Sequence, residues 1–218
     1  MRSVLAAAVV GFMLSSLDAR AEVTVDNQIW LSGAVRTELI DDLKLGFTQH
    51  VRFANDAKDL ERVIPELDVS YGLLEYLEVG LGGRYTFEKD EDGQRSQRLR
   101  VFGDLGVEAP ALGPVELSYR LRLQRETGAE APAKGRLRNK LGLGVSTGTM
   151  FKPGAFYEHF MDPSGESGHK AQKYRAGLGV GVKLSQEHRV KIKLHQDTEI
   201  DGDGDKERVV SLGYRYSF

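Results

Sequence analysis

The chain has 218 residues, of which 40% are hydrophobic and 28% charged, with a formal net charge of -2 and no cysteine. The missing cysteines exclude a fold held together by disulfides. No apolar run after the N-terminal segment approaches the length of a membrane helix, which excludes a helical membrane protein.

The first 21 residues have the organisation of an export signal. A single charge at Arg2 precedes an apolar run over residues 4–14, which is too short to cross a bilayer as a mature helix. The small-residue pattern Ala19-Arg20-Ala21 follows. We expect signal peptidase to cut after Ala21 and to leave residues 22–218 as one domain.

The rest of the chain alternates apolar and polar residues over eleven strand-length segments. Most are long enough to span a hydrocarbon core as tilted strands. No helical periodicity is visible after the signal peptide. The segments cover residues 28–38, 43–54, 62–73, 77–88, 97–109, 115–125, 135–146, 152–161, 172–184, 189–198 and 207–218.

The segment 77–88 shows the alternation clearly. Its odd-numbered positions from Leu77 to Phe87 are apolar or glycine, and its even-numbered positions from Glu78 to Glu88 are charged, small or polar. In a transmembrane barrel only alternate residues face lipid, so the mean hydropathy stays low while the period of two is strong. The pattern predicts an all-β fold, a transmembrane antiparallel up-and-down barrel.

The connections alternate in length, as expected for short turns on the periplasmic side and longer loops outside. Short turns fall near Ile40-Asp42, Leu74-Tyr76, Pro110-Pro114, Thr147-Met150 and Ser185-His188, and longer polar loops near 55–61, 89–96, 126–134, 162–171 and 199–206.

The strand count leaves two alternatives, because single-chain bacterial barrels have even numbers of strands. Residues 22–27 could add a short strand and give twelve, or the first segment could lie outside the ladder and leave ten. We favour twelve within a range of ten to twelve.

The last segment carries an apolar residue at every second position and ends in an aromatic. This resembles the C-terminal signal that the barrel-assembly machinery recognises. It places the protein in the outer membrane of a Gram-negative-type envelope, in contact with outer-membrane lipids, and we expect a monomer. The residues are Val210, Leu212, Tyr214, Tyr216 and Phe218.

Spaced residues along the chain resemble an uncharacterised outer-membrane family, domain of unknown function twenty-four-ninety. The resemblance implies a barrel and no known activity. A looser similarity of size, strand rhythm and basic wall links the chain to the oligogalacturonate and sialic-acid porins, and it implies the passage of acidic oligosaccharides. The family resemblance is carried by Trp30, by 43–53 with its ending His50-Val51-Arg52-Phe53, by Lys152-Pro153, Tyr157-Glu158 and Phe160, and by the final hairpin.

Inward positions of three consecutive segments hold a dense group of basic residues, which we expect to line a pore in its external half. Guanidinium groups suit carboxylates and phosphates, so this basic patch indicates a diffusion pore that favours small anionic solutes. The alternative is a structural barrel closed by Arg-Glu ladders, although Asp104 and Glu116 would neutralise the patch only in part. The patch comprises Arg98, Arg100, Arg120, Arg122, Arg136, Arg138 and Lys140.

Other chemistry has weaker support. Asp201, Asp203 and Asp205 alternate as in a calcium loop, but Lys206 and Leu212 occupy positions that need glycine and glutamate, which excludes an EF-hand and favours a simple hairpin loop.

A barrel enzyme is the third possibility. His195 and Asp197 share an inward face, yet no activated serine is evident beside them. We expect no enzyme activity, no cofactor or metal, and no nucleic-acid binding.

Overall fold

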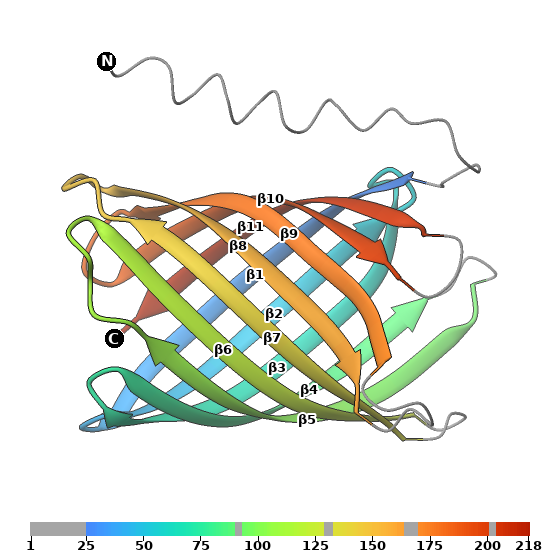
Figure 1. The fold of residues 1–218 in the computed structure, drawn as a ribbon. Coiled ribbons are helices and arrows are strands. Elements are labelled where there is room, and N and C mark those ends of the chain that lie inside the picture. The colour runs from blue at the N-terminus through green and yellow to red at the C-terminus, as the bar shows by residue number, and fades with distance from the viewer. Residues whose placement is uncertain (1–24, 90–92, 129–132, 164–169, 201–203) are drawn as a thin grey trace, which may run out of the picture.

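The computed structural model describes residues 25–89, 93–128, 133–163, 170–200 and 204–218. All regular structure in these ranges is β-strand, arranged as one closed barrel (Figure 1). The predicted signal peptide and its cleavage site at Ala21 lie outside the described residues. The strands are β1 (Val25–Ile40), β2 (Leu43–Ala54), β3 (Asp59–Leu74), β4 (Leu77–Lys89), β5 (Arg95–Glu108), β6 (Val115–Gly128), β7 (Lys134–Val145), β8 (Phe151–Asp162), β9 (Lys170–Lys183), β10 (His188–Glu199) and β11 (Lys206–Ser217).

The topology confirms the predicted up-and-down barrel. Each strand pairs antiparallel with its sequence neighbours, and β1 closes the barrel against β11. Each of the eleven predicted segments overlaps one observed strand. Backbone groups are paired all round the barrel, so no open sheet edge remains. In the described part of the chain no helix is long and apolar enough to cross a membrane.

The described strands number eleven, within the predicted range, and the favoured count of twelve is wrong. Residues 25–27 are the beginning of β1 rather than part of a separate rising strand. An odd number makes the first and last strands run in the same direction, so the closing pair is parallel, from Val25 opposite Lys206 to Arg36 opposite Ser217. The amide of Phe218 extends this seam by donating to the carbonyl of Arg36 at 3.1 Å.

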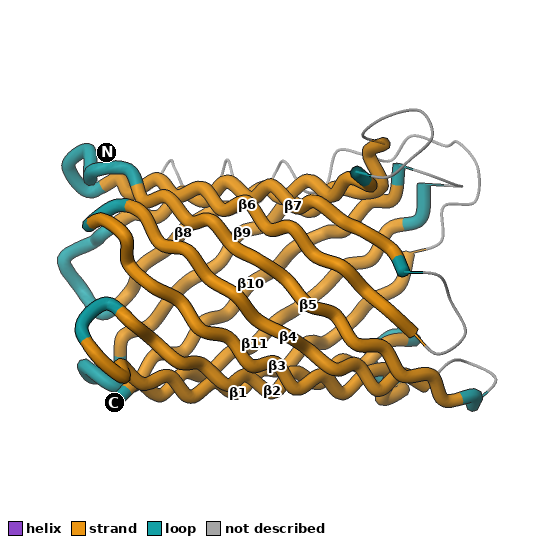
Figure 2. The backbone as a smooth tube through the Cα atoms, turned by 90° about the horizontal axis from the view of Figure 1, so that it is seen from below, coloured by secondary structure: helices purple, strands orange, loops and turns teal. Residues whose placement is uncertain are grey.

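Loops and turns lie at the two ends of the barrel, with tilted strands between them (Figure 2). We call the end with the β2–β3, β4–β5, β6–β7, β8–β9 and β10–β11 connections the loop end, and the opposite end the turn end. The expected long loop at 55–61 is shorter than predicted, because β3 begins at Asp59. Positive φ angles at Asn55, Asp56 and Ala57 form this tight turn.

Side chains alternate between an apolar outer surface and a polar lumen. On β4, Leu81 is 73% exposed on the outside, whereas Arg84 and Thr86 are buried in the lumen. The lumen therefore takes the place of a core, and charged residues fill much of it.

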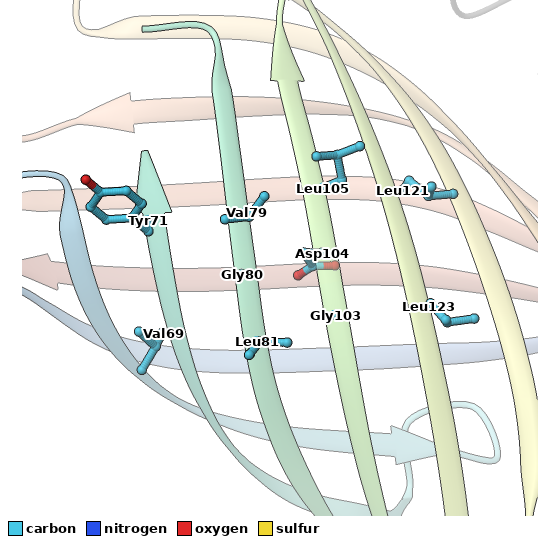
Figure 3. Close-up of a pocket in the computed structure, with 10 residues that line it drawn as sticks. All are labelled: Val69, Tyr71, Val79, Gly80, Leu81, Gly103, Asp104, Leu105, Leu121 and Leu123. Atoms are coloured by element: carbon cyan, nitrogen blue, oxygen red, sulfur yellow. The ribbon is translucent and has the colours of Figure 1, made fainter. Parts of the chain in front are cut away.

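The outer surface is indented over β3 to β6. The indentation has a volume of about 560 Å³ and apolar walls, and it lies where the outward position Gly103 brings no side chain (Figure 3). Its apolar lining matches the outer face of a barrel that contacts lipid. The outward side chains that line it are Val69, Tyr71, Val79, Leu81, Leu105, Leu121 and Leu123.

Candidate functional site

The candidate site is the barrel lumen, where inward side chains from every wall form three groups of ion pairs. Cross-strand register sets these groups, since residues directly opposite on adjacent strands bring their side chains close together. Opposite charges at such positions attract, so the strand pairing itself builds the network.

The first group joins β3, β4, β5 and β6. Glu66 lies directly opposite Arg84 and is ion-paired with it, while Asp104 lies opposite Arg122. Arg122 donates to both carboxylate oxygens of Asp104, at 2.7 and 2.5 Å, and this fork is the strong bidentate geometry of arginine. A 4.0 Å contact between Arg122 and Glu66 links the two pairs.

The second group is centred on two carboxylates that face the lumen and yet are only 1% exposed, Glu158 and Asp197. Arg175 lies opposite both, on the strand between them, and bonds Asp197 at 2.5 and 2.6 Å and Glu158 at 3.4 Å. Arg138 donates to Glu158 at 2.8 Å, and Lys173 lies 3.0 Å from Asp197. These buried charges are therefore neutralised by several partners each.

The third group lies nearer the loop end. Glu88 pairs with Arg62 at 2.6 Å and with Arg98, and Glu126 pairs with Arg98 at 3.3 Å and with Arg100. A small cavity of about 30 Å³ adjoins these residues. That volume is on the scale of a single water molecule.

Aromatic rings fill the space between the charges. Arg122 stacks 3.7 Å from the centre of the Phe102 ring, and Arg138 lies 4.9 Å from that of Phe160. Trp30 has the guanidinium of Arg52 at 3.8 Å and that of Arg175 at 4.9 Å. The middle of the lumen is thus occupied by stacked rings and guanidinium groups as well as by ion pairs.

All seven residues of the predicted basic patch take inward positions on β5, β6 and β7, but they do not form an unpaired cluster. Asp104 neutralises Arg122 as expected, whereas Glu116 pairs with Lys152 instead. Arg136 donates to Gln172 at 3.1 Å.

Two members of the patch lie near the middle of the barrel. Arg120 and Lys140 lie opposite each other, one step closer to the turn end than Arg122 and Arg138. The Nη2 atom of Arg120 is 3.8 Å from Glu158, and Lys140 lies over the Phe156 ring at 4.6 Å.

The main partners missed from the sequence are Glu66, Glu88, Glu126 and Glu158. Strand register was the signal that could have found one of them, because Glu126 lies directly opposite Arg100 once β5 and β6 pair. The polar run 126–134 predicts a loop that includes Glu126, whereas β6 extends to Gly128.

The His195–Asp197 pair does not have the geometry of a catalytic dyad. The Nε2 atom of His195 is 3.7 Å from Asp197, and neither ring nitrogen has a hydrogen-bond partner in the described part of the molecule. Trp30 and Phe156 pack edge-on against the imidazole, at 5.1 and 5.9 Å between ring centres. The ring therefore contributes to packing of the lumen.

Within the described ranges, no three histidine, aspartate or glutamate side chains are grouped to hold a metal ion. Asp201 and Asp203, from the calcium-like spacing, lie outside those ranges.

Comparison with known proteins gives one family match. Residues 27–207 match the family described as Protein of unknown function (DUF2490). No curated protein matches the chain. The match covers most of the barrel and assigns it no activity.

Proposed function

We propose that this chain, which belongs to the DUF2490 family of proteins of unknown function, is an outer-membrane barrel with a closed lumen. The closing element is the second group of ion pairs, which we call the ion-pair layer: Arg138, Glu158, Lys173, Arg175 and Asp197. The observation that carries this proposal is the burial of Glu158 and Asp197, which face the lumen and are 1% exposed. In an open water-filled channel, wall carboxylates at this level would be in contact with water.

Placement in the outer membrane is part of the proposal. Apolar side chains such as Leu81 and Leu123 are exposed all along the outer face, which suits contact with lipid. The last strand, β11, presents Val210, Leu212 and Tyr214 outward. We propose that the assembly machinery recognises this strand and its end at Phe218, that the protein reaches it by an N-terminal signal, and that it acts as a monomer.

Energetics favour a layer that stays closed at rest. Breaking a buried ion pair by removing one partner costs about 3–5 kcal/mol, because the other charge is left buried without compensation. Glu158 has three arginine partners within 4.0 Å, from β6, β7 and β9, so opening the lumen there would separate several pairs at once.

A layer-deletion variant tests the proposal. Arg138→Ala, Glu158→Ala and Arg175→Ala together remove one carboxylate and two of its guanidinium partners from the layer. Asp197 loses Arg175 but keeps Lys173 at 3.0 Å. We expect vesicles with the wild-type barrel to retain an entrapped small sugar and vesicles with the triple variant to release it.

The control for this experiment is Glu116→Ala with Lys152→Ala, an ion pair near the turn end outside the layer. This variant should retain the sugar. Rapid release through the folded wild-type barrel would contradict closure.

A second candidate function is a diffusion pore that favours small anionic solutes such as acidic oligosaccharides. The observation in its favour is that Lys191 and Lys193 face the lumen with no carboxylate within ion-pair distance in the described part of the chain. An enzyme remains the third candidate and has less support, because His195 has no hydroxyl partner.

A further inference from the structure

The turn-end half of the lumen has a different charge balance from the ion-pair layer. On β10, Arg189, Lys191 and Lys193 occupy alternate inward positions. The neighbours of Lys191 are Gly181 on β9 and Gly213 on β11, and those of Lys193 are Gly179 and Ser211. The two lysines are therefore flanked on both sides by residues with little or no side chain.

Two further cations face the same region from β6 and β7. Lys140 lies 4.6 Å and Lys193 5.6 Å from the centre of the Phe156 ring, so one aromatic side chain brings both ammonium groups together. Lys140 lies directly opposite Arg120 on β6 and directly opposite Glu158 on β8. We call Arg120, Lys140, Lys191 and Lys193 the turn-end cationic cluster.

The cluster is short of compensating carboxylates. Among the described residues, Lys140, Lys191 and Lys193 have no carboxylate within 4.0 Å, and Arg120 has only the 3.8 Å contact with Glu158. Glu158 lies directly opposite Lys140, but its carboxylate is already paired with Arg138 and Arg175. Nearby acids on the opposite wall are already engaged, Asp68 with Arg36 at 3.2 Å and Asp104 with Arg122 at 2.5 Å. Like charges held together in this way are stabilised by an added anion.

Glycines keep the wall around the cluster clear. A Cβ at Gly177 would come within 2.9 Å of the Phe156 ring and 2.5 Å of the His195 Cβ, and a Cβ at Gly179 would come within 3.1 Å of Lys193. Water reaches the cluster, because Lys191 is exposed and the Arg120 side chain is 37% exposed. Toward the loop end, the buried Arg122, Arg138 and Glu158 bound this region.

We propose that the turn-end cationic cluster binds a small, multiply charged anion carrying phosphate or carboxylate groups, which enters from the turn end. Ammonium groups on flexible stems supply point charges that adapt to such a ligand, and the Arg120 guanidinium supplies a fork for one of its oxygen pairs. The anion offsets the mutual repulsion of the four cations. This inference goes beyond the closed lumen and does not require passage through the barrel.

Calorimetric titration of the refolded barrel in an uncharged detergent tests the site, with inorganic pyrophosphate and citrate as probes. We expect saturable binding of both, and binding that weakens several-fold as sodium chloride rises from about 50 to about 300 mM. The double variant Lys191→Gln with Lys193→Gln should weaken binding by about tenfold or more, because two of the four charges are lost.

The matched control is Lys58→Gln with Lys134→Gln, which removes the same charge at the loop end and should bind as the wild type does. A second variant, Gly181→Leu, keeps every cation but adds a side chain next to Lys191. Its Cβ has room, with the nearest heavy atoms at 3.7 and 3.9 Å, and we expect it to fold and to lose binding.

Absence of pyrophosphate and citrate binding by the folded wild type would overturn the proposal, as would equal weakening in the two double variants. This outcome is separable from failure of the closed-lumen proposal. A conducting wild type would refute closure without changing the isotherm, and a flat isotherm would refute the site without changing the conductance.

Discussion

At the scale of single residues, the position of Glu158 explains why so many arginines face the lumen of this barrel. Its carboxylate is 1% exposed and accepts hydrogen bonds from Arg138 and Arg175. A buried carboxylate is tolerated only when paired and hydrogen-bonded. The cations and the acid therefore depend on each other, and the layer is stable as a unit.

The substitution Glu158→Gln should consequently destabilise the barrel by about 3–5 kcal/mol, because the surrounding guanidiniums lose their counter-charge. Urea unfolding in phospholipid vesicles measures the loss. The matched control, Glu116→Gln, affects a carboxylate whose side chain is 38% exposed and which pairs with Lys152, so it should cost under about 1 kcal/mol. Equal costs at the two positions would show that Glu158 is not specially buried.

At the scale of strands, alternation made most of the fold predictable. The predicted segment 77–88 and the observed β4 differ by one residue in length. The prediction is accurate here because charged, small or polar residues at inward positions alternate with apolar residues or glycine at outward positions. Strand ends were less predictable, since polar residues occur both in loops and in the lumen. Glu126 is polar because it faces the lumen and pairs with Arg100, whereas its polarity alone predicts a loop.

Two features were harder to predict from the sequence: which residues form ion pairs, and whether the number of strands is odd or even. Predicting that Glu158 neutralises Arg138 and Arg175 requires register across three strands. Eleven strand segments are visible in the sequence, but the rule that bacterial barrels have even numbers of strands favours twelve. The barrel closes with eleven because β1 and β11 pair in parallel.

The outer face of β4 gives a test of the lipid contact. Leu81→Arg should cost about 2–4 kcal/mol if the residue lies near the bilayer midplane. Ser118→Arg, at an exposed inward position on β6, should cost much less, because its side chain would lie in a polar lumen. Urea unfolding in vesicles compares the two, and similar costs would mean that the two faces are misassigned.

The parallel seam between β1 and β11 can be tested by cross-linking, since the chain has no cysteine of its own. Ser32 lies directly opposite Gly213, so Ser32→Cys with Gly213→Cys should form a disulfide on mild oxidation. Gel mobility without and with reductant reports the bond. The control pair Ser32→Cys with Ser211→Cys is offset by two residues and should react far more slowly; faster cross-linking of the offset pair would refute this register.

At the scale of the whole molecule, the barrel combines an apolar exterior, an ion-pair layer in its lumen and a basic turn-end half. The formal charge of -2 conceals this arrangement, because basic and acidic groups are separated in space. Near its centre the lumen behaves as a polar core, and toward the turn end as a water-accessible basic surface. We propose that such a barrel separates its two ends and offers an anion site to one of them.

Single-channel recording of the wild-type barrel in planar lipid bilayers tests the closed lumen most directly. We expect insertion without steady current steps in symmetric potassium chloride, because Glu158 and Asp197 face the lumen and are only 1% exposed. Steady steps of current from the folded wild type would contradict closure. If such steps occur, the reversal potential under a salt gradient gives the ion preference. A value close to the equilibrium potential of chloride would support the pore that favours anions.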